Sequence, residues 1–247
     1  MKIIGVYNIK GGVGKTATSV NVAWMASNHG LRTLVWDLDP QGAASFYFRI
    51  KPKLDARSRS LLKGKEDLED LIKGTDYDLL DLLPADFSYR HMDLMLEDAG
   101  HPTKQLERIL EPLKSSYDLI ILDCPPSISL VSENVFRAAD LLLVPMIPTT
   151  LSVRTLQQLR DFLREHRRTL GVDLLPFFSM VDRRKRMHLE IISSLPESFP
   201  ELLSTQIPYS SDIERMGEYR TPLAEYAPKG PAMQAYYALW QEVCSRL

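Results

Sequence analysis

The chain has 247 residues, of which 45% are hydrophobic and 25% charged, and its formal net charge is −2. This length and apolar content suffice to bury the core of one α/β domain, and we expect a single domain over residues 1–247. The same values exclude an intrinsically disordered chain and a uniformly basic nucleic-acid binder.

Short apolar segments alternate with helical patterns along the chain. Strands are predicted at residues 2–8, 32–37, 78–83, 118–123, 141–145 and 174–181, and helices at residues 15–28, 67–73, 104–114, 130–138, 153–169 and 232–246. Most of the strand segments are rich in Ile, Leu and Val without polar alternation, which is typical of a parallel sheet buried on both faces. The order predicts a doubly wound α/β fold, with a mostly parallel sheet flanked by helices and ligands bound at the edge where the strands end.

The cysteines and the N-terminus bear on the cellular compartment. Cys124 and Cys244 lie far apart in sequence, and two cysteines form neither a disulfide framework nor a four-ligand metal site. The chain runs directly into a strand pattern without room for a signal peptide, and no apolar run approaches the roughly 18 residues of a membrane span. We therefore expect a cytoplasmic protein.

Charge is spread unevenly over the chain. Residues 66–98 hold eleven acidic and two basic residues, whereas residues 151–190 hold nine basic and five acidic ones. A local basic surface can bind a polyanion even when the total charge is near zero. Solvated helix faces explain the same pattern, and both interpretations stay open.

A glycine-rich loop follows the first predicted strand and precedes the first predicted helix. The glycines of residues 9–16 allow a tight turn that brings N–H groups against phosphate oxygens, beside the positive end of the helix. Lys15 is then expected to reach the β- and γ-phosphates of a nucleotide, and the Thr16 hydroxyl to bind Mg²⁺. Ile9 stands where the strict P-loop pattern has glycine, so this is a variant of the pattern.

The run Lys10-Gly-Gly-Val-Gly-Lys-Thr16 resembles the deviant Walker A loop of the ParA/MinD family of P-loop ATPases. This resemblance implies a SIMIBI-like P-loop NTPase fold and ATP contacts from Lys10, Gly11, Gly12, Val13, Gly14, Lys15, Thr16 and Ala17. It also implies that Lys10 reaches across an ATP-bound homodimer to the partner's phosphates. A cation supplied in trans in this way is worth roughly 10³–10⁵ in rate in other nucleotidases. Relatives usually have Thr at the position of Ala17.

Two aspartates follow later strands. Asp39, in the run Asp37-Leu-Asp-Pro-Gln-Gly42, matches the family's switch I, where it orients the attacking water. Asp123 ends an apolar strand as in a Walker B motif and is expected to hold Mg²⁺ through a water. Cys124 follows in a segment similar to switch II, and we expect it to be a small buried packing residue rather than a nucleophile.

Segments near the C-terminus also resemble the family. Residues 178–183 are similar to the strand end beside the adenine, and residues 206–208 to the loop that packs on the base. The resemblance implies base contacts from Met180 and Pro208. A place in the core or in a turn is the alternative for each.

ParA-type relatives bind DNA without sequence preference through surface basic residues. The candidates here are Arg183, Arg184, Lys185 and Arg186, expected in a loop after the sixth strand, together with Arg215 and Arg220. An ATP dimer would present two copies of this surface and so add avidity. The family's arginine after the Ile-Pro step is replaced here by residues 209–212, Tyr-Ser-Ser-Asp, and a solvated basic loop remains the alternative.

The resemblance is closest to the short ParA type. No basic amphipathic extension follows the last predicted helix, which argues against a membrane anchor of the MinD kind. The expected protein is an ATPase using ATP and Mg²⁺, associated with the nucleoid, that forms an ATP sandwich dimer and binds DNA. A ParB-like or cargo-adaptor protein would stimulate hydrolysis, and the cargo could be a plasmid, a chromosome region, or a protein assembly such as a carboxysome or chemoreceptor cluster.

Two other functions use a similar phosphate loop. An amidoligase or synthetase would activate a carboxylate. Such enzymes need a substrate pocket, often from an added domain, for which we expect this chain to have no spare length, and Lys10 would be unexplained. An electron carrier like the nitrogenase iron protein needs two cluster cysteines per subunit, a pattern that Cys124 and Cys244 do not fit.

Overall fold

The computed structural model describes residues 1–51 and 68–247. Its central feature is an eight-stranded sheet in the order β3-β4-β2-β5-β1-β6-β7-β8, parallel except where β3 pairs with β4. The strands are β1 (Lys2–Val6), β2 (Thr33–Asp37), β3 (Lys73–Gly74), β4 (Leu80–Leu83), β5 (Leu119–Asp123), β6 (Leu141–Met146), β7 (Asp173–Val181) and β8 (Gln206–Pro208).

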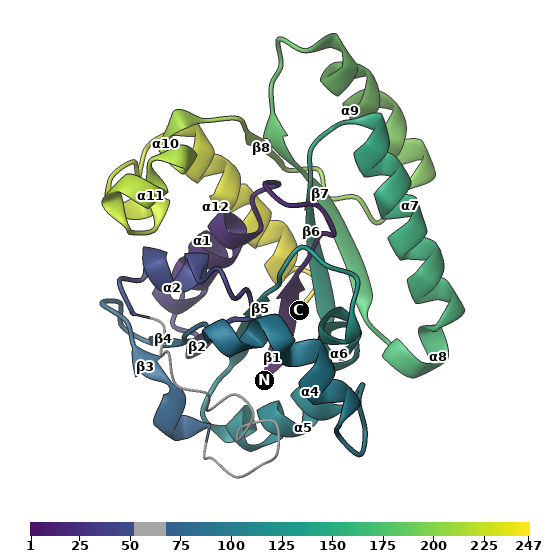
Figure 1. Cartoon of the computed structure of the whole chain (residues 1–247). Coiled ribbons are helices and arrows are strands. Elements are labelled where there is room, and N and C mark those ends of the chain that lie inside the picture. The colour runs from purple at the N-terminus through teal and green to yellow at the C-terminus, as the bar shows by residue number, and fades with distance from the viewer. Residues whose placement is uncertain (52–67) are drawn as a thin grey trace.

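Helices cover both faces of this sheet (Figure 1). They are α1 (Lys15–Asn28), α2 (Ala43–Tyr47), α4 (Met92–Glu97), α5 (Gln105–Leu110), α6 (Leu130–Ala138), α7 (Thr150–Glu165), α8 (Arg167–Leu170), α9 (Arg186–Ser198), α10 (Ser211–Glu214), α11 (Met216–Tyr219) and α12 (Pro231–Cys244). Short 3₁₀ turns span Glu69–Leu71, Phe87–His91, Glu111–Ser115 and Leu223–Glu225. The expected doubly wound α/β fold is confirmed.

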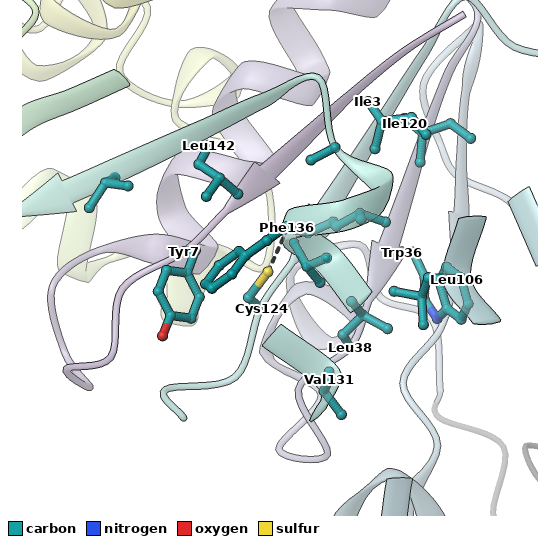
Figure 2. Close-up of a cluster of buried hydrophobic side chains, with 14 of the residues drawn as sticks. Ile3, Tyr7, Trp36, Leu38, Leu106, Ile120, Cys124, Val131, Phe136 and Leu142 are labelled. Atoms are coloured by element: carbon teal, nitrogen blue, oxygen red, sulfur yellow. Dashed lines mark hydrogen bonds between the residues drawn. The ribbon is translucent and has the colours of Figure 1, made fainter. Parts of the chain in front are cut away.

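Two apolar cores lie on the two faces of β1, because successive side chains of a strand point to opposite sides. Ile3 and Tyr7 join the core made with α4, α5, α6, α7 and α9, part of which Figure 2 shows. Ile4 and Val6 join the core made with α1, α2 and α12. Both faces of the central strand are therefore buried, which explains its continuous apolar sequence.

Most expected elements are present close to their predicted bounds. The six strands are confirmed, and α1 and α6 occupy the residues predicted for them. The helix predicted at residues 153–169 begins earlier, because Thr149 caps the helix by accepting a hydrogen bond from the Ser152 N–H, and it breaks between α7 and α8. The helix predicted at 104–114 gives way to a 3₁₀ turn at Pro112. The last helix, α12, lies within one or two residues of its predicted bounds.

One predicted helix is wrong, and several elements were not expected. Of the helix predicted at 67–73, Asp67 lies outside the described residues, and the rest forms a 3₁₀ turn followed by the edge strand β3, which pairs with β4. Pairing with β4, which follows a few residues later in the chain, overrides helix propensity at the end of this segment. Neither β8 nor α9 was predicted, because β8 spans only three residues and α9 contains Pro196. Within the described ranges, no helix is long and apolar enough to cross a bilayer.

Gly5 marks the closest approach of α6 to the central strand. A Cβ added at Gly5 would lie 2.7 Å from Cγ1 of Val135 and 2.9 Å from Cδ2 of Leu142. The Val135 side chain is β-branched and buried in α6, so it has little freedom to move aside. We expect Gly5→Ala to lower the free energy of unfolding by about 1–3 kcal/mol in urea denaturation.

Gly100→Ala is the matched control for that substitution. A Cβ at Gly100 meets nothing within 4 Å, so its effect should stay within about 0.5 kcal/mol. Equal stabilities for the two variants would contradict the close packing of α6 on β1.

Candidate nucleotide-binding site

The loop between β1 and α1 has the backbone conformation of a phosphate-binding turn. Gly12 has φ of 69° and Gly14 has φ of 92°, in the left-handed region that glycine adopts without strain. Gly14 is also the N-cap residue of α1, so the loop leads into the positive end of that helix. The main-chain geometry explains why glycines occupy these two positions.

A cleft of about 330 Å³ opens above this loop at the carboxyl edge of the sheet. Of the residues predicted to bind nucleotide, it is lined by Gly11, Gly12, Gly14, Lys15, Thr16, Ala17, Asp39, Met180 and Pro208. Segments from four parts of the sequence meet here, because parallel strands end at the same edge. The structure therefore brings the predicted phosphate and base residues into one site.

Three predicted residues do not line the cleft. Val13 is buried with 1% of its surface exposed, and Asp123 is buried below the loop. The Lys10 side chain lies elsewhere, with its Nζ donating to Ser152 Oγ at 3.3 Å. The two lysines of the loop thus have different surroundings.

The cleft also contains residues that sequence reasoning missed. They are Ala43, Tyr47, Pro126, Ser179, Tyr209, Ser210, Ile213, Glu214 and Tyr236. Tyr209 and Ser210 directly follow Pro208, so the neighbourhood of that residue was a usable signal. Tyr47 and Tyr236 lie on α2 and α12, and nothing local in the sequence distinguishes them from packing residues.

Lys15 is held in the loop by a main-chain acceptor. Its Nζ donates to the carbonyl oxygen of Lys10 at 3.0 Å, and only 7% of the residue is exposed. Burial lowers the pKa of Lys15, while the negative charges of Asp123 and Asp39 act in the opposite direction. Within the part of the chain that the structure describes, Lys15 forms no ion pair, so its buried ammonium is well suited to bind phosphate oxygens.

Asp123 ends β5 as a fully buried carboxylate. Its Oδ1 accepts a hydrogen bond from Ser19 Oγ at 2.8 Å, whereas its Oδ2 has no hydrogen-bond partner among the described residues. Burial raises the pKa of Asp123 to about 6, although the nearby hydroxyl groups of Ser19 and Thr16 favour the charged form. An orphaned carboxylate oxygen close to a threonine hydroxyl fits a hard divalent cation such as Mg²⁺.

No group of three or more His, Cys, Asp and Glu side chains that could hold a metal occurs within residues 1–51 and 68–247. This sparse set also suits Mg²⁺, which commonly binds proteins through one or two side chains and takes its other ligands from phosphates and water. Thr16 and Asp123 are the residues that would hold the ion.

The two aspartates after β2 have different environments. Asp37 is fully buried and accepts hydrogen bonds from Ser45 N at 2.8 Å and Ser45 Oγ at 2.7 Å. Burial, reinforced by the charge of Asp123, raises the pKa of Asp37 to about 7. Asp39 lines the cleft, and its Oδ1 accepts from the Gln41 N–H at 2.9 Å. Asp37 therefore holds α2 to the sheet, and Asp39 is the carboxylate that faces the site.

The basic run after β7 differs from its expected form. Residues 183–185 form the turn, but Arg186 is the first residue of α9 rather than part of the loop. Arg184 makes two hydrogen bonds to Asp182, at 2.9 and 3.0 Å, and Arg186 pairs with Glu190 at 2.7 Å. The run is therefore partly neutralised by neighbouring carboxylates.

The other basic candidates also differ in whether their side chains have a partner within the protein. In the described part of the chain, Arg183 and Lys185 form no ion pair. Arg215 pairs with Glu218 at 3.1 Å, and Arg220 donates to the Phe46 carbonyl and lies 4.4 Å from its ring centroid. Among the described residues, Lys185 and Arg183 are thus the cations of this group whose charged side chains have no partner.

The fold and the phosphate loop together are typical of P-loop ATPases. A family profile described as "AAA domain" matches residues 1–175. The chain is 31% identical to the sporulation initiation inhibitor protein Soj of Bacillus subtilis, over 99% of this chain and 98% of that protein. With this relative and the deviant Walker A loop, the chain belongs to the ParA/MinD family.

Two solved structures show the same fold. McdA from Cyanothece in complex with ATP has a TM-score of 0.85 and 21% identity, covering 99% of this chain and 96% of that one. Cobyrinic acid a,c-diamide synthase from Mycobacterium smegmatis, with a bound ATP analogue and magnesium, has a TM-score of 0.84 and 25% identity over 99% and 94%. Proteins described by different functions therefore share this architecture.

The unpartnered oxygen of Asp123 allows a direct test of the metal assignment. We expect Asp123→Asn to abolish most of the increase in ADP affinity that Mg²⁺ produces, because a neutral amide is a poor ligand for a hard cation. Binding in EDTA should be unchanged. Titration of a fluorescent ADP analogue with and without Mg²⁺ measures both quantities.

Asp118→Asn, at the opposite end of the same strand, is the control. Asp118 is partly buried and pairs with Arg32 rather than with a group of the cleft, so its loss should leave the Mg²⁺ effect intact. An undiminished Mg²⁺ effect in Asp123→Asn would show that the ion is held elsewhere.

Proposed function

We propose that this protein is a ParA-type positioning ATPase, in which ATP closes a homodimer that binds DNA and hydrolysis releases it. The observation that carries this proposal is the position of Lys10. Its ammonium group does not line the cleft that contains Lys15 and Thr16, so it does not serve the phosphates of its own subunit in this state. A second subunit offers a use for this cation, and family membership supports that use.

Within one subunit, the cleft residues take distinct roles in the proposed reaction. Lys15 and the loop N–H groups bind the β- and γ-phosphates, and Met180 and Pro208 contact the base. Mg²⁺, held by Thr16 and by Asp123 through a water, would neutralise charge on the phosphates. Asp39 orients the attacking water. The partner's Lys10 stabilises the charge that develops in the transition state.

The proposed dimer retains DNA through its basic surface, and a ParB-like or adaptor protein stimulates turnover. Arg183 and Lys185 are the best candidates for DNA contacts, because their charges have no internal partner in the described residues. Nucleoid association in the cytoplasm would follow from such DNA binding. The cargo is a plasmid, a chromosome region or a protein assembly.

A biosynthetic ligase remains the second candidate, and the likeness to the diamide synthase favours it. The expectation that chain length separates the two functions is not supported, since this chain spans 94% of that synthase. The match to Soj and the need to explain Lys10 favour the positioning ATPase. For the electron-carrier alternative, Cys124 is buried as expected and Cys244 is exposed on α12, which does not suit a cluster shared by both cysteines.

Substitution of Lys10 tests the central role in this proposal. We expect Lys10→Ala to bind ATP with near-normal affinity but to lose hydrolysis by about 10³-fold or more, because the cation acts from the partner subunit. Asp39→Ala retains Lys10 but cannot orient the attacking water, so it should not hydrolyse ATP and should accumulate as an ATP-bound dimer. Phosphate release and light scattering after size exclusion measure the two effects.

Lys229→Ala removes an exposed lysine of the same charge far from the loop in sequence and should behave like the wild type. Normal turnover in Lys10→Ala would remove the basis of the proposal. Normal turnover in Asp39→Ala would show that another group orients the water.

The pairing of the basic residues predicts which of them contact DNA. We expect Arg183→Ala combined with Lys185→Ala to lower the salt dependence of DNA binding by about two phosphate contacts per subunit. Arg184→Ala with Arg186→Ala should have a smaller effect, because Asp182 and Glu190 already neutralise these side chains. Both double variants change the net charge equally, so the difference reports direct contacts.

Fluorescence anisotropy with a non-specific duplex, measured in the presence of an ATP analogue over a range of salt, gives the two slopes. Equal slopes in both double variants and the wild type would place the DNA surface elsewhere.

A further inference from the structure

The Lys10 side chain is tied to a helix 142 residues further along the chain. Its Nζ donates to Ser152 Oγ at 3.3 Å, and Ser152 lies in the first turn of α7. At the main chain, the Lys10 N–H donates to Asn8 Oδ1 at 2.9 Å, and Asn8 Nδ2 donates to the Pro145 carbonyl at 2.8 Å. The backbone of Lys10 is therefore positioned through Asn8 by β6, and its side chain by the first turn of α7.

The Ser152 hydroxyl is itself held in place. Ser152 is 2% exposed, and its Oγ lies 2.9 Å from Thr149 Oγ1. The Ser152 N–H also donates to Thr149 Oγ1, which caps the helix. Because the cap uses the backbone of residue 152, the Ser152 side chain is not needed to form it. Its hydroxyl is free to receive Lys10.

The electrostatic environment makes the hydrogen bond between Lys10 and Ser152 weak. The ammonium lies at the N-terminus of α7, the positive end of a helix, and within residues 1–51 and 68–247 Lys10 forms no ion pair. A single neutral oxygen therefore holds it. Charged phosphate oxygens are much stronger acceptors, so a nearby triphosphate would draw Lys10 away from Ser152.

The same residue also responds to the nucleotide through its backbone. The Lys10 carbonyl accepts the hydrogen bond from Lys15 Nζ at 3.0 Å. If Lys15 turns to phosphate, this hydrogen bond breaks, and one of the restraints on residue 10 is lost. Binding in the cleft and freedom of Lys10 are thus linked through two atoms of one residue.

We propose that Ser152 is a positioning residue that holds Lys10 inside its own subunit until nucleotide binds, and that ATP transfers Lys10 to a second copy of the chain. This inference rests on the proposed function, since it needs an acceptor site in the partner. Ser152 does not line the nucleotide cleft. Its contact with Lys10 sets the nucleotide concentration at which Lys10 becomes available to the partner subunit.

The decisive variant replaces the weak acceptor by a strong one. Ser152→Asp gives Lys10 a carboxylate partner, and an acidic residue in the first turn suits the helix, so the fold should be retained. We expect about tenfold more non-hydrolysable ATP analogue to be needed for half-maximal dimerisation than in Thr150→Asp. Thr150 is exposed in the same turn, so the control carries the same added charge. Light scattering after size exclusion gives the dimer fraction.

A second measurement reports the contact without any dimer. In the nucleotide-free protein, acetylation of the Lys10 amine by an N-hydroxysuccinimide ester, followed by mass spectrometry, should be about threefold or more faster in Ser152→Ala than in the wild type. Ser152→Thr keeps the hydroxyl and should restore the wild-type rate. Lys229 is the internal standard, and ADP affinity should be the same in all of these variants.

The outcomes separate the two hypotheses. If the wild type stays monomeric with the analogue while Ser152→Ala still exposes Lys10, the holding contact is supported, but the proposed function and the transfer of Lys10 fail. If the wild type dimerises but Ser152→Asp matches Thr150→Asp, the positioning role of Ser152 is overturned. Unchanged acetylation of Lys10 in Ser152→Ala overturns it as well.

Discussion

The nucleotide site depends on one buried carboxylate, that of Asp123, whose hydrogen bonds do not fully offset the cost of burying its charge. Asp123 is fully buried at the end of β5, and within residues 1–51 and 68–247 one of its oxygens has no hydrogen-bond partner. Burying a charge in this way is unfavourable unless it is paired or coordinates a metal. The hydroxyl groups of Ser19 and Thr16, both on α1, offset part of this cost. The same carboxylate therefore interacts with the end of β5 and with the helix that follows the phosphate loop. A bound cation and its nucleotide would complete that arrangement.

The two lysines of the loop illustrate how position separates similar side chains. Lys15 is buried and its ammonium is bonded to the loop's own backbone, whereas the Lys10 ammonium is bonded to the start of α7. A second lysine in the phosphate loop is characteristic of the ParA/MinD family, so the different positions of the two ammonium groups are consistent with different roles. The proposed trans role and the proposed contact with Ser152 describe the same side chain in two states.

The surface chemistry differs from what residue counts suggest. Four consecutive basic residues follow β7, but Arg184 and Arg186 are paired with carboxylates that lie two and four residues away. An ion pair on the surface contributes little to stability, yet it changes how much field a side chain presents to a polyanion. Any DNA surface built here depends on the pairing of each residue as well as on the number of cations.

Much of the fold and of the site was predictable from the sequence, because both are encoded locally. Buried parallel strands have continuous apolar runs, and glycines mark the positive φ of the loop. Asp39 lies shortly after one strand pattern, and Asp123 ends another. Those signals extend over a few residues, so the fold class, the phosphate loop and the acidic residues could be assigned. The short strands β3 and β8 could not, since pairing with a neighbour defines them.

Only the tertiary structure decided which side chains meet. Tyr47 and Tyr236 enter the cleft from separate helices, and Lys10 meets Ser152 across 142 residues of sequence. Asp37 and Asp39 are alike in the sequence, but one anchors α2 and the other faces the cleft. Local pattern reports the conformation of a segment, whereas contacts between distant segments depend on the packing of the sheet and its helices.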